Sequence, residues 1–486
     1  MNNVISPLPT TADLLQFYAH KTPDKAALRW GNHSCTFAQL HEHLTLCSAY
    51  LCRTLPTLST GQVVAVSTED FLWQWVSLLA LEQLGLCSMS VLPGEVNAGF
   101  VQQFSVGALI APVQQVHPVP VVVVNAQACG GHSNPPHPPA PGQDRAQQTA
   151  LRLLRTSGTT GEAKRILLDR RLWNGWTERW QWFCHYGPDS VCLIQHPFSI
   201  GGIYATATAC LRAGGTVVKR DGRAFLQALQ DFGISHATVL PMDLGPILQT
   251  APEQAAIPQK IMLTAFGGVL PSDMVAQCLA LFAHQVADMY GTNEVGFIGA
   301  RVAGPDRQME PGIALLPGVE VEVVNDADQT LPAGETGHIK VRTPHMAARY
   351  EGDPGATSAH FLGGWFWPGD LGRALPNGRL ELTGRADDLI NIGGMKVNPA
   401  LAESKLRSLD YVRDAAVLMG STPSGVQTVV IAVVFTAAGR MERLQKEAAP
   451  GMAAFGHLVE WVQVEAIPRT PTGKVQRSVL RAQLQG

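Results

Sequence analysis

The residues best suited to chemistry lie between Arg155 and Arg165, in the stretch RTSGTTGEAKR. Hydroxyl residues and glycines are interleaved there, and Lys164 follows Gly161 by three positions. Glycines let backbone N–H groups approach an anion closely, hydroxyls donate further hydrogen bonds, and the lysine adds a full positive charge. The stretch therefore predicts a loop that binds phosphate.

The spacing of this loop differs from the P-loop NTPase signature, which is G-x-x-x-x-G-K-[ST]. Counted from Gly158, the second glycine of that signature would fall on Ala163. Arg165 stands where the hydroxyl that holds Mg²⁺ would be needed. An ordinary Ser/Thr/Gly surface loop is the alternative that the stretch alone leaves open.

A second reactive stretch is VADMYGTNEVGFIG at residues 286–299. A strand-like VADMY runs into the sequence GTNE, which we expect to form a turn beyond the edge of a sheet. Glu294 could hold Mg²⁺ there, and the ring of Tyr290 offers a flat face on which a base could stack. Turns after strands commonly carry Gly, Asn and Glu, so this stretch is also compatible with a plain turn.

Two further stretches lie near the C-terminus. In GWFWPGDLG at 364–372, Asp370 is an acceptor for a ribose diol, or else part of an Asp-bearing turn. The run GRADD at 384–388 places three charges in four positions, which suits a domain hinge where charges stay solvated through a rotation. In IPRTPTGKVQRSVL at 467–480, Lys474 follows a glycine in a turn-like segment; by itself it is an exposed lysine.

The elements around these stretches indicate an α/β protein. Residues 1–125 alternate helical patterns with short apolar strands, which is typical of a largely parallel sheet. A predicted strand, TALRLLR, leads into the phosphate loop, as expected for a ligand site at the carboxyl edge of such a sheet. The Pro/Gly-rich residues 129–145 are predicted to be a mobile linker. Beyond about residue 315 the chain turns strand-rich, which suggests hairpins or a small barrel.

Composition narrows the function classes. A chain of 486 residues suggests two or three structural units, and 46% apolar with 15% charged residues is ordinary for a soluble globular protein. The net charge of −3, without a basic stripe, argues against nucleic acid as the main partner. The apolar runs are too short to span a membrane, no secretory signal is visible, and the nine cysteines form no C-x-x-C pair. We therefore expect reduced thiols and a cytoplasmic location.

Two side-chain patterns in the sequence have simple explanations. Trp173, Trp176 and Trp180 fall on one face of a predicted helix, and we expect them to face the core rather than a ligand. His41 and His43 lack the spacing of a helical zinc site. The sequence predicts no metal cluster made by the protein alone.

Taken together and in this order, the four stretches resemble the adenylate-forming (ANL) superfamily. That group includes acyl- and aryl-CoA synthetases, adenylation domains of nonribosomal synthetases, and luciferases. The resemblance covers nearly the whole chain and extends to TFAQL near the start, GGVLP at 267–271 and LPAGETGHIKVRTP at 331–344. It implies an N-terminal domain (1–384) of parallel α/β sheets with a small β-barrel-like part, and a small mobile α+β C-terminal domain (385–486).

The resemblance implies a two-step reaction. The enzyme would join a carboxylic acid to ATP with Mg²⁺, release pyrophosphate, and pass the acyl group from acyl-AMP to a thiol. The thiol would belong to CoA or to the phosphopantetheine of a carrier protein. An aryl acid or an acyl acid of short or medium length is expected. The alternative is a non-catalytic nucleotide-binding protein that descends from such enzymes.

The resemblance also assigns residues. The phosphate loop would consist of Thr156, Ser157, Gly158, Thr159, Thr160, Gly161 and Lys164. The adenine side would include Gly267, Gly268, Tyr290, Gly291, Thr292 and Asn293. Glu294 would bind Mg²⁺, Asp370 and Arg385 the ribose, and Lys474 would bridge the acid and the nucleotide. Lys474, Glu294 and Lys164 would be the catalytic residues.

The remaining assignments concern the acid, the thiol and the domain rotation. Ser199, Gly268 and Gly291 would line the acid pocket, Gly393 and Gly394 the thiol tunnel, and Asp387 would be the hinge. Ser199 stands where many members carry a His or an aromatic residue. The segment PFSIGG has no Asp to pair with an amine, which argues against an α-amino acid as substrate.

Four other positions depart from the family pattern. Ala163 replaces the usual Pro, Asn293 a Thr, Pro368 a Thr, and Asn391 a Lys. Because an amide can replace a hydroxyl as a donor at position 293, we expect an active enzyme.

Overall fold

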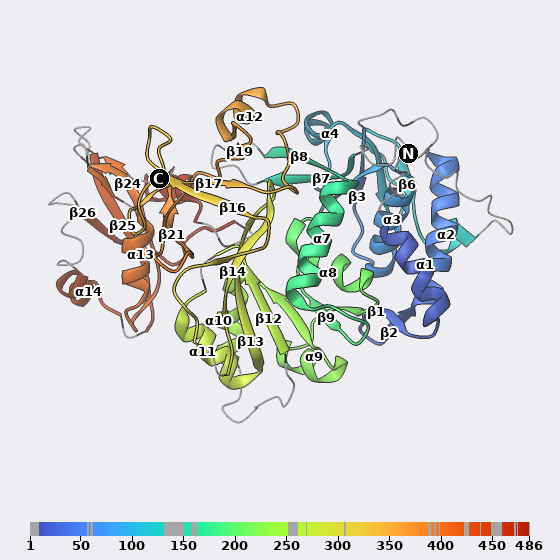
Figure 1. The fold of residues 1–486 in the computed structure, drawn as a ribbon, viewed down its shortest axis with the longest axis horizontal. Coiled ribbons are helices and arrows are strands. Elements are labelled where there is room, and N and C mark those ends of the chain that lie inside the picture. The colour runs from blue at the N-terminus through green and yellow to red at the C-terminus, as the bar shows by residue number, and fades with distance from the viewer. Residues whose placement is uncertain are drawn as a thin grey trace, which may run out of the picture.

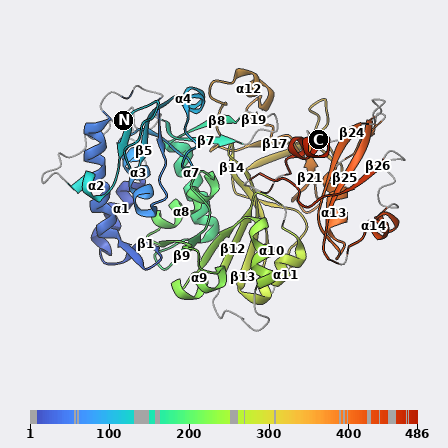
Figure 2. The same cartoon turned by 180° about the vertical axis from the view of Figure 1, so that it is seen from behind.

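A computed structural model gives the fold of the protein (Figure 1). The structure describes residues 9–55, 58, 62–130, 150–156, 163–250, 261–268, 270–305, 308–386, 390–392, 395–397, 399–421, 427–437, 439–448, 459–470, 473 and 475–485. Viewed from the front and from behind, the last part of the chain forms a lobe beside a larger body (Figures 1 and 2). The proposed linker at 129–145 lies almost wholly outside the described residues.

A six-stranded sheet leads into the predicted phosphate loop. Its order is β6-β5-β3-β4-β7-β8, and every pairing is parallel except that of β7 with β8. The strands are β3 (Val63–Val66), β4 (Cys87–Ser90), β5 (Val106–Ala111), β6 (Val121–Val123), β7 (Ala150–Thr156) and β8 (Lys164–Asp169). Among the residues that the structure describes, the helices before β7 are α1 (Thr11–Lys21), α2 (Phe37–Thr54), α3 (Phe71–Gln83), α4 (Ala98–Phe104) and α5 (Ala126–Gly130). All four residues of β3 are buried, as in a parallel strand covered on both faces.

A nine-stranded sheet carries the second reactive stretch. Its order is β15-β14-β13-β12-β11-β9-β10-β1-β2, and the pairings from β13 to β1 are parallel. The strands are β1 (Ala26–Trp30), β2 (His33–Thr36), β9 (Val191–Ile194), β10 (Thr216–Lys219), β11 (His236–Val239), β12 (Ile261–Phe266), β13 (Ala283–Thr292), β14 (Gly296–Ala303) and β15 (Ala314–Leu315). Because β9, β11, β12 and β13 are parallel neighbours, the segments that follow them meet at one edge of the sheet.

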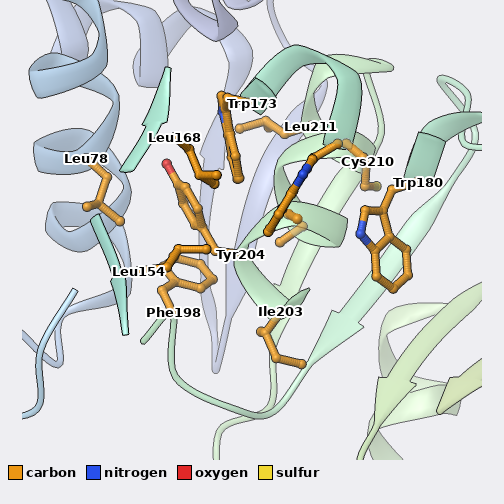
Figure 3. Packing of buried hydrophobic residues seen from close by; sticks show 14 of the residues in the cluster. Leu78, Leu154, Leu168, Trp173, Trp180, Phe198, Ile203, Tyr204, Cys210 and Leu211 are labelled. Atoms are coloured by element: carbon orange, nitrogen blue, oxygen red, sulfur yellow. The ribbon is translucent and has the colours of Figure 1, made fainter. Parts of the chain in front are cut away.

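Helices α7 (Arg170–Cys184) and α8 (Gly201–Arg212) contribute to an apolar cluster that includes residues of both sheets (Figure 3). Trp173, Trp176 and Trp180 are 2%, 4% and 5% exposed, which confirms that this stripe faces the core. Trp173 stacks on Tyr204 with ring centroids 5.2 Å apart. The other helices of this region are α9 (Phe225–Phe232), α10 (Pro241–Thr250) and α11 (Ser272–Leu281).

The strand-rich region after residue 315 forms a third, antiparallel sheet. Its order is β18-β19-β17-β20-β21, with β16 paired to β17. The elements are β16 (Glu320–Val324), β17 (Gly337–Arg342), α12 (Pro354–His360), β18 (Phe361–Leu362), β19 (Trp365–Phe366), β20 (Asp370–Ala374) and β21 (Leu380–Arg385). These pairings match the predicted hairpins, and they follow an open path among the strands that the structure describes.

The C-terminal lobe has its own cores. A hairpin of β22 (Ile390–Ile392) and β23 (Met395–Val397) precedes a sheet of order β24-β25-β26. The other elements are α13 (Pro399–Arg407), β24 (Val412–Ser421), β25 (Gln427–Phe435), α14 (Met441–Ala448), β26 (Val459–Gln463) and α15 (Arg477–Gln485). Apolar residues of β24 and β25 point alternately into two clusters, one on each face of the sheet. The predicted fold class is confirmed; the domain boundary at 384/385 and the mobility of the lobe stay predictions.

Two observations bear on the predictions from composition. Within the described ranges, the helices are all too short or too polar to cross a bilayer. The nine cysteines are free thiols, and all but Cys52 are buried.

Candidate active site

The predicted phosphate loop connects the two strands of an antiparallel pair. Thr156 at the end of β7 pairs with Lys164 at the start of β8, and Arg155 pairs with Arg165. Lys164 is therefore the first residue of a strand rather than the last of a loop. Ser157, Gly158, Thr159, Thr160 and Gly161 lie outside the described residues. The two ends of the loop are thus held at one sheet edge, opposite each other.

Lys164 has two partners that the sequence did not predict. Its Nζ lies 3.0 Å from Nε2 of His360 and 4.9 Å from the centre of the Tyr350 ring. The ring of Tyr350 lies edge-on to that of His360, with centroids 5.8 Å apart. Neither partner is a carboxylate, so both hold the ammonium group without neutralising its charge.

Glu294 lies in the turn between β13 and β14 and is only 7% exposed. The phenol of Tyr350 donates a hydrogen bond of 2.7 Å to its Oε1. Burial and then the charge of Glu294 raise the pKa of Tyr350 above its ordinary value, so the phenol stays a proton donor. Tyr350 thereby joins Lys164 to Glu294, the two charged groups assigned to phosphate and metal.

The side-chain amide of Asn293, one of the departures from the family pattern, bonds to the backbone at the end of β7. Asn293 Nδ2 donates to the carbonyl oxygen of Arg155 at 3.0 Å, across a separation of 138 residues. A Cβ added to Gly201 would lie 3.1 Å from Asn293 Oδ1, so the start of α8 also approaches this turn. The end of β7, the β13–β14 turn and the start of α8 therefore converge on Asn293. Ser199 is partly buried in the segment just before α8.

Tyr290, Asp370 and Arg385 form a second polar group. The phenol of Tyr290 donates to Asp370 Oδ2 at 2.6 Å, and Arg385 Nη1 donates to Asp370 Oδ1 at 2.7 Å. Arg385 and Asp370 are direct partners in the β20–β21 pair. Arg385 Nη2 also donates to the Pro368 carbonyl at 3.0 Å, so Pro368, one of the departures, contributes through its backbone. Burial, and then Asp370, raise the pKa of Tyr290 well above its ordinary value.

The strand β13 extends further than the sequence suggested. We expected the turn to begin at Gly291, but Gly291 pairs with Phe297 and Thr292 with Gly296. A Cβ on Gly291 would lie 2.5 Å from the Gly296 carbonyl oxygen, so only glycine fits this close pairing. The Tyr290 ring is 9% exposed, and its role as a stacking face for adenine stays a prediction.

The hydroxyl of Thr292 is buried and makes no hydrogen bond to the residues that the structure describes. Buried polar groups are nearly always paired, so this hydroxyl is available to a ligand or a water. Gly267 and Gly268 follow the neighbouring strand β12, and Gly267 has a positive φ of 91°. These residues lie at the same sheet edge, as the predicted nucleotide site requires.

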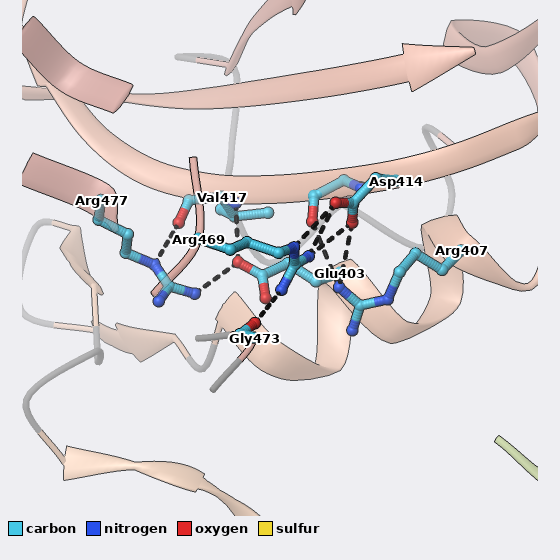
Figure 4. Close-up of polar contacts among 8 residues, drawn as sticks. Glu403, Arg407, Asp414, Val417, Arg469, Gly473 and Arg477 are labelled. Carbon is cyan, nitrogen blue, oxygen red and sulfur yellow. Dashed lines mark hydrogen bonds and ion pairs between the residues drawn. The ribbon is translucent and has the colours of Figure 1, made fainter. Parts of the chain in front are cut away.

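Described residues on either side of Lys474 make polar contacts within the C-terminal lobe (Figure 4). Arg469 binds both carboxylate oxygens of Asp414 and donates to the Gly473 carbonyl at 2.6 Å. Arg477 binds Glu403 at 2.5 Å and the Val417 carbonyl at 3.0 Å. Arg469, before Lys474, and Arg477, after it, are therefore bound to β24 and α13.

Several predicted residues fall where the structure makes no statement. These are Lys474, the hinge Asp387, and Gly393 and Gly394 of the thiol tunnel. The side chain of Asn391 also lies outside the described part. Their assigned roles stay predictions.

Sequence reasoning missed Tyr350 and His360. Tyr350 lies 56 residues from Glu294, and His360 lies 196 residues from Lys164. The segment RYEG around Tyr350 has neither the periodicity nor the glycine spacing that drew attention elsewhere. Only the folded chain brings these side chains together.

Comparison with known proteins shows which family the chain resembles. Residues 15–351 match the family model described as AMP-binding enzyme. A fatty acid–[acyl-carrier-protein] ligase, ScoC, from Streptomyces coeruleorubidus is 30% identical over 363 residues, which cover 71% of this chain and 69% of that protein. An indoleacetate–CoA ligase from Aromatoleum aromaticum is 28% identical over 348 residues, covering 69% and 67%.

Solved structures extend the match in fold beyond residue 351. The o-succinylbenzoate CoA synthetase from Bacillus subtilis, in complex with its acyl-adenylate intermediate, has a TM-score of 0.84 at 20% identity. The superposition covers 98% of this chain and 99% of that one. The two chains therefore share one fold, including the region of Asp370, Arg385 and the C-terminal lobe.

Proposed function

Because the chain belongs to the AMP-binding enzyme family, we propose that it activates an aryl acid or a short- to medium-chain acyl acid for transfer to a thiol. The enzyme is an acid–thiol ligase of the adenylate-forming kind. ATP and the acid give acyl-AMP and pyrophosphate, and the acyl group then passes to the thiol. A free carboxylate is a poor acyl donor, and the mixed anhydride with AMP supplies a good leaving group. A non-catalytic nucleotide-binding role is not favoured, since the named relatives are ligases.

The observation that carries the proposal is the convergence of two polar groups on the β13–β14 hairpin. Lys164 and Glu294 meet through Tyr350, and Asp370 and Arg385 meet at Tyr290. Tyr290 and Glu294 are four residues apart on one hairpin, so the two groups are neighbours. This arrangement supports phosphates and metal on one side and ribose on the other.

Each charged group would have a defined task at the pyrophosphate end. Lys164 and the loop that begins at Thr156 would stabilise the charge that develops on the leaving pyrophosphate. Mg²⁺ is usually held by one or two carboxylates together with substrate phosphates. The buried carboxylate of Glu294 meets this need, and its bond from Tyr350 leaves it oriented. Chelation of Mg²⁺ should therefore abolish acyl-AMP formation.

The ribose and the acid would be placed by the other residues. Asp370 is fixed by Arg385 and Tyr290, so its carboxylate is already oriented to accept hydrogen bonds from a ribose diol. Lys474 would bridge the acid carboxylate and the α-phosphate, and Asp387 would allow its lobe to rotate between the two steps. We assign these roles by resemblance to the family.

The acid pocket is proposed to lie between the start of α8 and the end of β12. A Cβ added to Gly202 would lie 2.9 Å from Cζ of Phe266, and Phe266 lies edge-on to Trp180 at 6.2 Å. The partly buried ring of Phe266, backed by the core residue Trp180, would supply an apolar aromatic wall that suits an aryl or aliphatic acid better than a charged one. Ser199, Gly268 and Gly291, which the resemblance assigns to this pocket, would offer no carboxylate to an amine.

The test of the whole reaction is product analysis. The enzyme is incubated with Mg-ATP, each acid of a panel, and either CoA or a holo carrier protein, and thioesters are identified by mass spectrometry. An acyl-CoA or an acyl-carrier protein would name both the acid class and the acceptor. If acyl-AMP forms but neither CoA nor the carrier protein becomes acylated, the thioester-transfer step would be removed from the proposal.

A further inference from the structure

The contacts of His360 define one hydrogen-bonding form of its ring. Its Nδ1 lies 2.7 Å from the carbonyl oxygen of Trp367. A carbonyl only accepts, so Nδ1 carries the hydrogen and, in the neutral ring, Nε2 is an acceptor. Nε2 faces the Lys164 ammonium at 3.0 Å, which can only donate. The two contacts therefore agree with one neutral tautomer.

The ring of His360 is also held in place by its neighbours. It stacks on Phe366 with centroids 6.2 Å apart and an interplanar angle of 29°, and it lies edge-on to Tyr350. The backbone completes the arrangement, since the Trp367 amide donates to the His360 carbonyl at 2.7 Å. A ring fixed in this way presents Nε2 to Lys164 in a single direction.

The same contacts link the phosphate loop to the ribose side. His360 ends α12, while Trp367 precedes Asp370 by three residues. The chain Lys164–His360–Trp367 therefore connects the first residue of β8 to the segment that begins β20. A neutral acceptor orients the ammonium group but leaves its charge for an anion, which a carboxylate in the same place would not do.

We propose that His360 is a positioning residue, which aims Lys164 at the pyrophosphate formed in the first step. The inference rests on the proposed function, in which Lys164 binds the leaving phosphates. This role has a specific consequence. Loss of the Nε2 acceptor should weaken pyrophosphate binding and leave the second step, which involves no pyrophosphate, unaffected.

Two substitutions separate the two ring nitrogens. His360→Asn keeps a donor near the Nδ1 position for the Trp367 carbonyl and lacks an acceptor for Lys164. His360→Gln places an amide oxygen near the Nε2 position and keeps that acceptor. His360→Phe keeps the ring packing and lacks both nitrogens, so it covers the case in which His360→Asn folds poorly.

The assay is exchange of labelled pyrophosphate into ATP, at varied pyrophosphate, with the acid identified for the wild-type enzyme. Hydrogen bonds from charged donors are worth enough to change an equilibrium about 10-fold or more when lost. We expect KM for pyrophosphate to rise about 10-fold in His360→Asn and His360→Phe, and about threefold or less in His360→Gln. Thioester formation from preformed acyl-AMP should stay near the wild-type rate in all three.

The outcomes separate this inference from the function on which it rests. Normal exchange by the wild type, with an unchanged KM for pyrophosphate in folded His360→Asn and His360→Phe, overturns the role of His360 alone. An equal loss in both half-reactions also overturns it, because that result indicates a general structural role. A folded wild-type enzyme without exchange for any acid overturns the proposed function and this assignment together.

Discussion

Replacing Arg469 with lysine should slow the first half-reaction, formation of acyl-AMP, and leave the second, transfer to the thiol, nearly unchanged. Arg469 Nε and Nη2 donate to Asp414 at 2.7–3.0 Å, and Nη1 donates to the Gly473 carbonyl at 2.6 Å. Lysine keeps the charge, but its single ammonium group cannot reproduce the planar fork that binds carboxylate and carbonyl at once. The loop that leads into Lys474 would lose its anchor on β24.

The size of the effect follows from these contacts. A hydrogen bond from a charged donor contributes about 1.5–3 kcal/mol when it is shielded from water. The side chains of Arg469 and Asp414 are 25% and 23% exposed, so solvent screening lowers the loss at the Gly473 carbonyl to about 1–2 kcal/mol. An energy of this size changes the population of the anchored loop by a factor of about 5–30.

Arg407→Lys is the matched control. Arg407 approaches the same Asp414 carboxylate at 3.8 Å from α13 and donates to the Ala415 carbonyl at 3.3 Å. Both of these contacts are with β24, so this variant alters the surroundings of the Asp414 carboxylate and leaves the bond from Arg469 to the Gly473 carbonyl in place.

The assay compares acid-dependent exchange of pyrophosphate into ATP with thioester formation from preformed acyl-AMP. We expect Arg469→Lys to lower exchange about 5–30-fold and to leave thioester formation within about twofold of wild type. Arg407→Lys should change neither rate by more than about twofold. Equal losses in both half-reactions of Arg469→Lys, or the same loss of exchange in Arg407→Lys, would refute the reasoning.

Three further predictions follow from single contacts or roles. Lys474→Ala should lower adenylation about 10²–10³-fold and spare thioester formation from preformed acyl-AMP; equal loss of both rates would remove Lys474 from the first step. Tyr290→Phe loses the phenol that donates to Asp370 at 2.6 Å, so KM for ATP should rise about 10-fold with little change in kcat, and an unchanged KM would contradict the contact's role. Burial alone would raise the pKa of Asp243, but hydrogen bonds, first that from His196, hold it below its ordinary value. Ionised Asp243 therefore contributes stability that is fully present above about pH 5 and is lost as the pH falls through its lowered folded-state pKa. The advantage of wild type over Asp243→Asn in unfolding free energy should shrink as the pH falls below about 5; a constant difference would argue against this role.

The sequence was informative about candidate functional residues that lie in short local patterns. The strand before Thr156 was predicted and is observed as β7, whereas Lys164, expected at the end of a loop, is the first residue of β8. Glu294 and Asp370 drew attention because each lies within three residues of a glycine near a strand end. The ion pair of Asp370 with Arg385 joins two positions that had been assigned to the same ligand.

The sequence could not give the contacts that depend on tertiary packing. Tyr350 and His360 carry no local signal. They reach Glu294 and Lys164 because the segment between β17 and β18 packs against the start of β8 and the β13–β14 turn, where the Glu351 amide donates to the Arg165 carbonyl and the Ala347 amide to the Glu294 carbonyl. The strand β13 also runs through Gly291, where a turn was expected, because the pairing with β14 extends it. A local turn propensity is overridden when a partner strand satisfies the backbone hydrogen bonds.

The measurement that tests the account most directly is acid-dependent exchange of labelled pyrophosphate into ATP by the wild-type enzyme. The panel includes benzoates, cinnamates, short and medium fatty acids, and amino acids, with Mg²⁺ present. The account predicts exchange with aryl or short- to medium-chain acyl acids and none with α-amino acids. A folded enzyme that binds ATP and shows no exchange with any acid, or exchange confined to amino acids, would contradict it.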